Sequence, residues 1–114
     1  MTLGQKKNKF TADIASLIIY AIDKGYDLRF QPEHVRHKAN SLHFIGLAKD
    51  FDLFVDGKWI TKSDAPEWIT LGEYWKTLST EDAVNRWGGD FDLDNDGKKY
   101  DDGNHFSIEH EGVK

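Results

Sequence analysis

The sequence predicts a single α+β domain over residues 1–114, in which helices pack on one face of a small antiparallel sheet and the candidate functional residues lie on the other face. Three observations support this fold class. Apolar residues recur at three- and four-residue steps in two segments, which is typical of helices. Apolar and polar residues alternate in several shorter segments, which is typical of half-buried strands. Histidines and aspartates stand on or beside these shorter segments.

The composition limits the functions that fit the chain. A net charge of −5 argues against nucleic acid as a partner, because a basic surface supplies most of the affinity for phosphates. The absence of cysteine excludes disulfides and thiolate metal sites. The longest apolar run, residues 15–22, is too short to span a bilayer, and the first residues lack the pattern of a signal peptide. We expect a monomer that is made in the cytoplasm and is not inserted into a membrane.

The first predicted element is an amphipathic helix over residues 8–24, with Thr11 as its N-cap and Gly25 as its stop. Its apolar stripe consists of Phe10, Ile14, Leu17, Ile18 and Ala21. Residues 26–30 alternate between apolar and polar side chains and predict a short strand. Residues 31–42 are polar and mixed, which predicts a loop.

Residues 47–55 predict a second strand whose two faces differ in character. One face carries Leu47, Lys49, Phe51, Leu53 and Val55, and the other carries Ala48, Asp50, Asp52 and Phe54. Asp56 and Gly57 are a strong hairpin signal, so residues 58–60 are expected to form the returning strand.

The second half of the chain alternates between helix and strand patterns. Residues 71–78 predict a helix, and residues 79–86 predict a further capped helical turn. The paired glycines within residues 87–91 break that turn, because glycine permits backbone angles that other residues avoid. Residues 92–103 are an acidic loop, and residues 104–110 alternate again and predict the last strand.

The candidate zinc ligands are two histidines and one aspartate: His43, Asp50 and His105. They converge if the second and last strands are neighbours in one antiparallel sheet. Catalytic zinc takes three protein ligands and leaves a position for water. Asp102, in a turn before the last strand, can accept a proton from that water and pass it to the leaving amine. The alternative is that Asp102 is a solvated turn residue like its neighbour Asp101.

A second metal site is predicted in the acidic loop, where alternating carboxylates precede a glycine as at the opening of a calcium-binding loop. The residues concerned are Asp92, Asp94, Asp96 and Gly97. Gly103 occupies the twelfth position, where a bidentate glutamate is usual, so that Asp101 or Asp102 would have to replace it. A solvated acidic turn without calcium is the alternative. Bound calcium would order the segment that leads to Asp102.

Two stretches resemble the signatures of a known enzyme family. The first is Ser41-x-His43-x-x-Gly46-x-Ala48-x-Asp50, and the second is Trp87-Gly88-Gly89-Asp90-Phe91 followed by Asp102-Gly103-Asn104-His105-Phe106-Ser107. Together they resemble the D-Ala-D-Ala carboxypeptidase/L-alanyl-D-glutamate peptidase family of zinc peptidases, in the form found in tailed bacteriophages. Residues 52–58 and 72–75 also resemble the phage members, so the resemblance extends over nearly the whole chain.

This resemblance implies a fold like that of hedgehog and D,D-peptidase domains, and it assigns a role to each matching residue. The positions that match the family's zinc ligands are His43, Asp50 and His105. Asp102 matches its catalytic carboxylate, which is usually glutamate in the cellular carboxypeptidases. Arg36 matches an arginine that steadies the substrate carbonyl or carboxylate. Because the loop after Arg36 is shorter than in most relatives, a solvated loop residue is the alternative there.

The implied substrate is the peptide stem of bacterial peptidoglycan. The expected scissile bond is L-Ala–D-Glu, and a D-Ala-D-Ala carboxypeptidase is the alternative. The resemblance to phage enzymes predicts an endolysin for host lysis, which collects in the host cytoplasm and reaches the periplasm and cell wall after holin pores open the membrane. A non-catalytic zinc- or calcium-binding module is the competing hypothesis. Asp102 and Arg36 speak against it, since a structural site needs neither.

Overall fold

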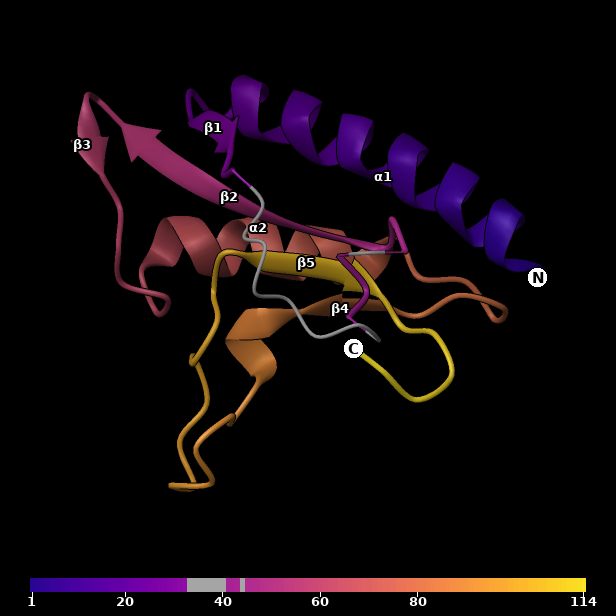
Figure 1. The fold of residues 1–114 in the computed structure, drawn as a ribbon. Coiled ribbons are helices and arrows are strands. Elements are labelled where there is room, and N and C mark those ends of the chain that lie inside the picture. The colour runs from indigo at the N-terminus through magenta and orange to yellow at the C-terminus, as the bar shows by residue number, and fades with distance from the viewer. Residues whose placement is uncertain (33–40, 44) are drawn as a thin grey trace.

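The computed structural model describes residues 1–32, 41–43 and 45–114. In these residues the chain forms two α-helices, five β-strands and one short 3-10 helix (Figure 1). In chain order they are α1 (Leu3–Asp23), β1 (Asp27–Phe30), β2 (Ala48–Val55), β3 (Lys58–Trp59), α2 (Pro66–Thr77), β4 (Asn85–Trp87), η1 (Gly88–Asp90) and β5 (His105–Ile108). The predicted α+β class with a small antiparallel sheet is confirmed.

Strand β2 is the centre of the sheet. Strand β1 pairs with one edge of β2, and β5 and β3 pair with different parts of its other edge. Strand β4 pairs with the outer edge of β5, and all four pairings are antiparallel. The hairpin predicted at Asp56 and Gly57 is confirmed, because both residues have positive φ angles, 51° and 77°, as a tight two-residue hairpin turn requires.

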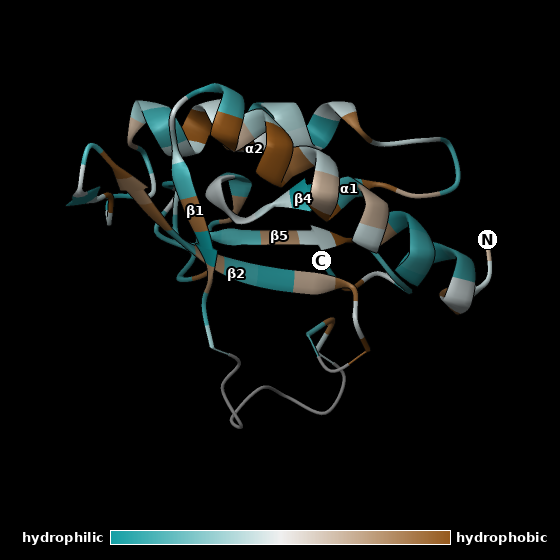
Figure 2. Ribbon diagram, turned by 90° about the horizontal axis from the view of Figure 1, so that it is seen from above, coloured by the Kyte–Doolittle hydropathy of each residue, from teal (hydrophilic) through white to brown (hydrophobic). Residues whose placement is uncertain are grey.

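The helices pack on one face of the sheet. The buried ring of Trp75 in α2 packs edge-on against Phe106 of β5 and Phe10 of α1, with ring centroids 5.8 Å apart in both pairs. Trp75 Nε1 also donates to the main-chain oxygen of Ser107 at 3.1 Å. Figure 2 places α2 on one side of β2, β5 and β4. Because successive strand residues point to opposite faces, His105 points away from the helices.

Replacing Trp75 with alanine is expected to lower the free energy of unfolding by about 3–5 kcal/mol, because the substitution leaves a cavity between the helices and the sheet. Trp59 provides the control, since it is 61% exposed. Its replacement with alanine is expected to change the free energy of unfolding by about 1 kcal/mol or less. Urea unfolding followed by circular dichroism measures both variants. Equal effects of the two substitutions would contradict this description of the core.

The first helix begins earlier than predicted. It starts at Leu3 because Thr2 and Gln5 form a reciprocal capping box, in which each side chain bonds to the main-chain N–H of the other residue, at 3.1 and 2.8 Å. Thr11, the predicted N-cap, therefore lies inside the helix, and its hydroxyl donates to a main-chain oxygen one turn earlier. Among the described residues, no helix is long and apolar enough to cross a membrane.

The part of the chain between β3 and β4 also differs from the prediction in two places. Helix α2 begins at Pro66, because proline at the first helical position has the required φ angle and needs no partner for an N–H. The helical turn predicted for residues 79–86 is wrong, since this segment leads into β4. The side chain of buried Asn85 accepts from Lys9 Nζ at 3.0 Å and donates to Asp13 at 3.1 Å. These contacts with α1 hold the first residue of β4 against the helix, and a tight turn closed by a bridge between Thr80 and Ala83 precedes it.

Candidate metal centre

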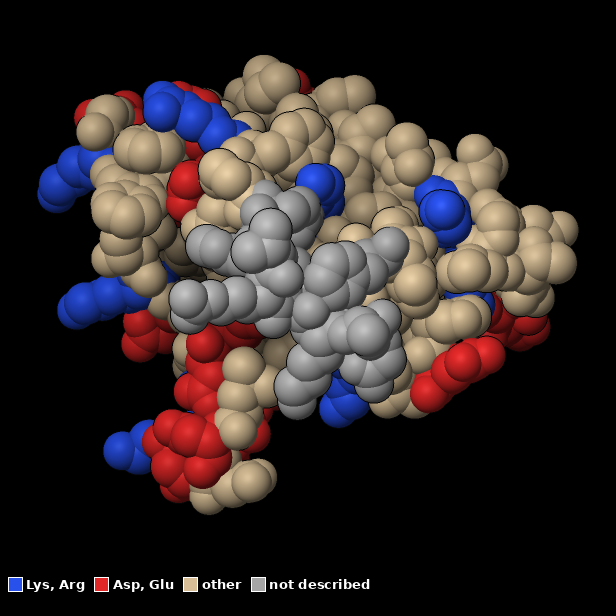
Figure 3. Space-filling view, viewed as in Figure 1, with Lys and Arg blue, Asp and Glu red and all other residues tan. Residues whose placement is uncertain are grey.

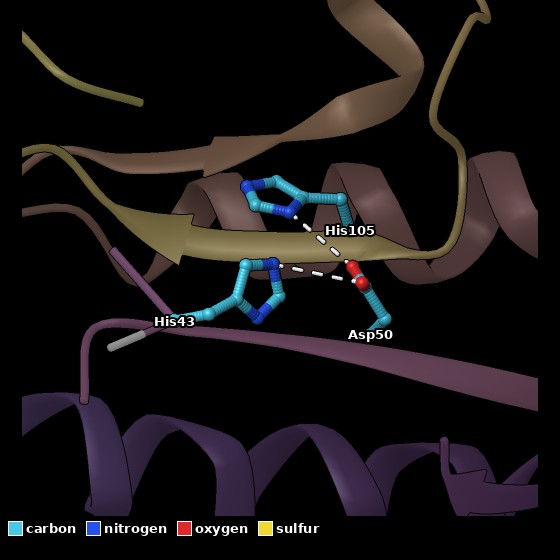
Figure 4. Close-up of side chains that lie close together, drawn as sticks. All are labelled: His43, Asp50 and His105. Atoms are coloured by element: carbon cyan, nitrogen blue, oxygen red, sulfur yellow. Dashed lines mark ion pairs between the residues drawn. The ribbon is translucent and has the colours of Figure 1, made fainter. Parts of the chain in front are cut away.

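Three predicted ligands meet on the face of the sheet opposite the helices (Figure 4). Asp50 of β2 and His105 of β5 are directly opposed in the antiparallel register, so their side chains lie side by side on this face. His43 lies in the turn that precedes β2, where Ser41 Oγ accepts a hydrogen bond from its main-chain N–H at 3.2 Å. Gly46, with φ of 76°, allows the chain to turn from His43 into the strand.

The distances within this group suit a single metal ion. Asp50 Oδ2 lies 3.6 Å from His43 Nε2, and Asp50 Oδ1 lies 3.3 Å from His105 Nδ1. One donor atom from each of the three residues lies within 4.8 Å of the other two. A tetrahedral zinc ion with bonds of about 2.0–2.2 Å separates its ligand atoms by about 3.3–3.6 Å. Two imidazoles and one carboxylate can therefore hold a divalent ion after small side-chain adjustments.

The ring of His105 is oriented by the main-chain oxygen of Lys114. Its Nε2 lies 3.0 Å from the main-chain oxygen of Lys114, and Ser107 Oγ donates to the same oxygen at 3.0 Å. Because a carbonyl oxygen only accepts hydrogen bonds, Nε2 must carry the proton. The lone pair of the neutral ring then lies on Nδ1, which faces Asp50. Such an outer hydrogen bond fixes both the tautomer and the direction of a metal-binding histidine.

Asp102 lies beside this group, in the turn before β5. The main-chain N–H of His105 donates to the oxygen of Asp102 at 3.0 Å, and Asp102 Oδ2 lies 3.8 Å from His105 Nδ1. Burial raises the pKa of the Asp102 carboxyl above its ordinary value; the charge of His105 lowers it, and the charges of Asp50 and Asp101 raise it further. The predicted position, in a turn close to the ligands, is confirmed. A partly buried carboxylate with a raised pKa is suited to accept a proton.

The surroundings of His105 also change its affinity for protons. Burial lowers its pKa, but the hydrogen bond with Asp50 and the negative charges of Asp102 and Asp50 outweigh burial. The pKa of His105 in the metal-free protein therefore lies above the ordinary value of 6.5. Protons and a metal ion compete for Nδ1, because only the neutral ring offers a lone pair to the metal.

The affinity of this group for a divalent metal ion is therefore expected to fall as the pH decreases, starting above pH 6.5, by about tenfold for each pH unit and each proton displaced. Competition with a chromophoric chelator between about pH 5.5 and pH 8 measures this dependence. His110→Gln provides a control, since His110 interacts with Lys6 rather than with the metal ligands. It should leave the slope unchanged. An affinity that does not vary over this range would show that His105 does not bind the ion.

The acidic loop brings its three predicted calcium ligands, Asp92, Asp94 and Asp96, together in exposed positions. Their carboxylates accept hydrogen bonds from the loop's own N–H groups, and Asp101 Oδ2 accepts from the N–H of Leu93 at 2.6 Å. These hydrogen bonds hold the loop in its turned conformation. Calcium binding stays a prediction, which is tested by following the amide NMR signals of residues 92–103 during a calcium titration.

Arg36, the remaining predicted site residue, lies outside the described residues.

Two contributors to the centre were missed in the sequence analysis. The oxygen of Lys114 has no sequence signal, because a main-chain acceptor is independent of residue type. Gly88 does have a signal in the paired glycines: a Cβ at this position would lie 1.9 Å from the oxygen of Asp102 and 2.8 Å from Cβ of His105. Close approach to these two residues therefore requires glycine at position 88.

Acidic side chains gather around the lower part of this face. Figure 3 shows Asp and Glu side chains over the projecting loop that joins η1 to β5, seen at the bottom of Figure 1. This charge favours cations over anions near the metal centre.

A scan against models of known protein families and a search of curated protein sequences found no match to this chain.

Proposed function

We propose that this protein is a zinc metallopeptidase that hydrolyses a peptide bond in the stem of bacterial peptidoglycan. The observation that carries the proposal is the arrangement of four side chains on one face of the sheet. Three of them, His43, Asp50 and His105, can hold a metal ion, and Asp102 lies 3.8 Å from a ligand nitrogen. A purely structural metal site has no need of the additional carboxylate.

The roles of the residues follow from their chemistry. Zinc, when bound, would polarise the scissile carbonyl and increase the acidity of the attacking water. The carboxylate of Asp50 would compensate part of the positive charge of the ion. Its contact with His105 keeps the ligand atoms of both residues directed toward one point. Asp102 accepts the proton of the attacking water and delivers it to the nitrogen of the leaving amine. Its burial favours the protonated intermediate form, because the neutral carboxyl is less costly to bury than the carboxylate.

The choice of substrate depends on the sequence resemblance. The paired signatures around His43 and His105 are similar to those of phage enzymes that cut the L-Ala–D-Glu bond of the peptide stem. We therefore propose this bond, with the terminal D-Ala-D-Ala bond as the alternative. The corresponding biological role is that of an endolysin, which gains access to the wall through holin pores at the end of a phage infection.

Mass spectrometry of digested peptidoglycan tests the proposal. Purified protein loaded with zinc is incubated with murein, and the soluble fragments are identified. We expect stem peptides with a new N-terminal D-Glu, no such fragments in the presence of a chelator, and recovery after zinc is returned. Loss of only the terminal D-Ala would identify a carboxypeptidase. Unchanged murein at all zinc concentrations would contradict the peptidase proposal and favour a binding module.

A further inference from the structure

A small polar pocket lies next to the metal centre. Its volume is about 170 Å³, and its lining includes Asp52 of β2, Trp59 of β3 and Asn104, the residue before His105. Asp52 follows Asp50 by two residues on the same strand, so the two carboxylates share one face of the sheet. At about 3.3 Å per residue, they lie about 7 Å apart along β2. The pocket is therefore one side-chain position away from the proposed reaction site.

The pocket exists because two strands use different parts of the same edge of β2. Strand β5 pairs with β2 up to Asp50, and β3 pairs with it only from Phe54 onward. Hydrogen bonds mark the two sides of the gap, from Phe51 N to the oxygen of Asn104 at 3.1 Å and from Ile60 N to the oxygen of Leu53 at 2.8 Å. The rings of Phe51 and Trp68 also line the pocket. A side chain can enter between the two strands without disturbing either pairing.

Asp52 gives the pocket a negative wall. Its half-buried carboxylate accepts a hydrogen bond from Gln31 Nε2 at 3.2 Å. Arg29 lies opposite Asp52 in the register with β1, but its guanidinium bonds to Asp27 at 2.7 Å and stacks on the ring of Phe54 at 4.1 Å. The charge of Arg29 is thus matched by Asp27. Arg29 also attracts Asp52 electrostatically, but its hydrogen bonds go to Asp27, so the carboxylate of Asp52 can still pair with a cation in the pocket.

Trp59 adds a second feature that favours a cation. Its side chain is 61% exposed although it lines the pocket, and its ring stacks on that of Phe54 with centroids 6.4 Å apart. The face of an indole ring attracts ammonium groups and also packs against the methylene groups that carry them. A carboxylate at one wall and an aromatic ring at another match an aliphatic arm that ends in a positive charge.

We propose that this pocket binds a primary ammonium group carried by an aliphatic side chain of the substrate, as in a peptide that contains a diamino acid. The inference rests on the proposed peptidase function and deepens it, because it assigns a specificity subsite one or two residues from the bond that is cut. In this subsite Asp52 pairs with the ammonium group, and Trp59 packs against the aliphatic arm.

Two synthetic stem peptides test the subsite. Both carry lysine after the L-Ala–D-Glu bond, one with a free side-chain amine and one with that amine acetylated. We expect kcat/KM to be at least about tenfold higher for the free amine, because acetylation removes a charge-assisted hydrogen bond. In Asp52→Asn this preference should disappear, because kcat/KM falls for the peptide with the free amine and stays the same for the acetylated peptide. Asp56→Asn, the same substitution at the exposed hairpin turn, should retain the preference.

Peptide binding, followed by the indole NMR signal of Trp59 in the zinc-loaded protein, separates the subsite from the peptidase. Amine-dependent binding that Asp52→Asn abolishes, without cleavage of either peptide, would support the subsite and overturn the peptidase. Equal cleavage of both peptides by the wild-type protein would overturn the subsite alone. An equal decrease in kcat/KM for both peptides in Asp52→Asn would also overturn the subsite. If the protein neither binds nor cleaves the peptides, both proposals are overturned.

Discussion

Replacing Asp102 with asparagine is expected to lower kcat by about 10²- to 10⁴-fold while the protein still binds zinc. The amide has nearly the same size as the carboxylate, but it cannot accept a proton from water or return one to the leaving amine. Asp102 lies 3.8 Å from His105 Nδ1 and is not one of the three grouped ligands, so its loss should leave the metal site intact. Peptide hydrolysis and metal content, measured on the same preparation, give both quantities.

A matched control for this variant is Asp82→Asn, which makes the same change at an exposed position in another turn. It should hydrolyse the peptide at the wild-type rate. If Asp102→Asn retains activity within tenfold of the wild type, a different group accepts the proton and the role assigned to Asp102 is wrong. If it loses zinc instead, Asp102 belongs to the coordination sphere.

Gly88→Ala is expected to weaken zinc binding by about 10- to 100-fold, although residue 88 is not a ligand. The added methyl group would lie 1.9 Å from the oxygen of Asp102 and 2.8 Å from Cβ of His105, so both residues must move. The turn is also held by the Gly88 oxygen, which accepts from the N–H of Asp102 at 3.2 Å. Overpacking of this kind lowers the free energy of unfolding by about 1–3 kcal/mol.

Chelator competition and urea unfolding measure the two effects of Gly88→Ala. Gly4→Ala is the matched control, because the nearest atom to an added Cβ there is 3.9 Å away, in an open position on α1. This control should bind zinc normally and unfold at the same or a slightly higher urea concentration. Wild-type zinc affinity in Gly88→Ala would show that the turn beneath the site can shift without moving its ligands.

The ligand group could be predicted from sequence because strand periodicity constrains it. Alternation in residues 47–55 places Asp50 on the face opposite Phe51, and alternation in residues 104–110 places His105 opposite Phe106. Once the apolar residues face the helices, the two ligands must share the other face. Their direct opposition in the register additionally depends on the pairing of β2 with β5, which no local pattern contains.

The errors have a different origin. The segment before β4 has polar residues that suit a helix cap, but buried Asn85 bonds to Lys9 and Asp13 of α1, and these distant partners decide its conformation. The early start of α1 depends on the capping box of Thr2 and Gln5, which lies outside the apolar stripe used to define the helix. Tertiary contacts and terminal hydrogen bonds thus explain why the observed boundaries of the elements differ from the predicted ones. They do not affect the predicted positions of the three candidate ligands.

The metal ligands come from both sides of the β2–β5 pairing, so the complete set exists only while these strands are joined. An ion that binds only this form adds about 1.4 kcal/mol to the free energy of unfolding for each tenfold excess of free ion over its Kd. Resistance to proteases would then follow the metal content of the surroundings. We therefore expect slower cleavage by proteases when the free concentration of the bound ion is high than when the ion has been removed.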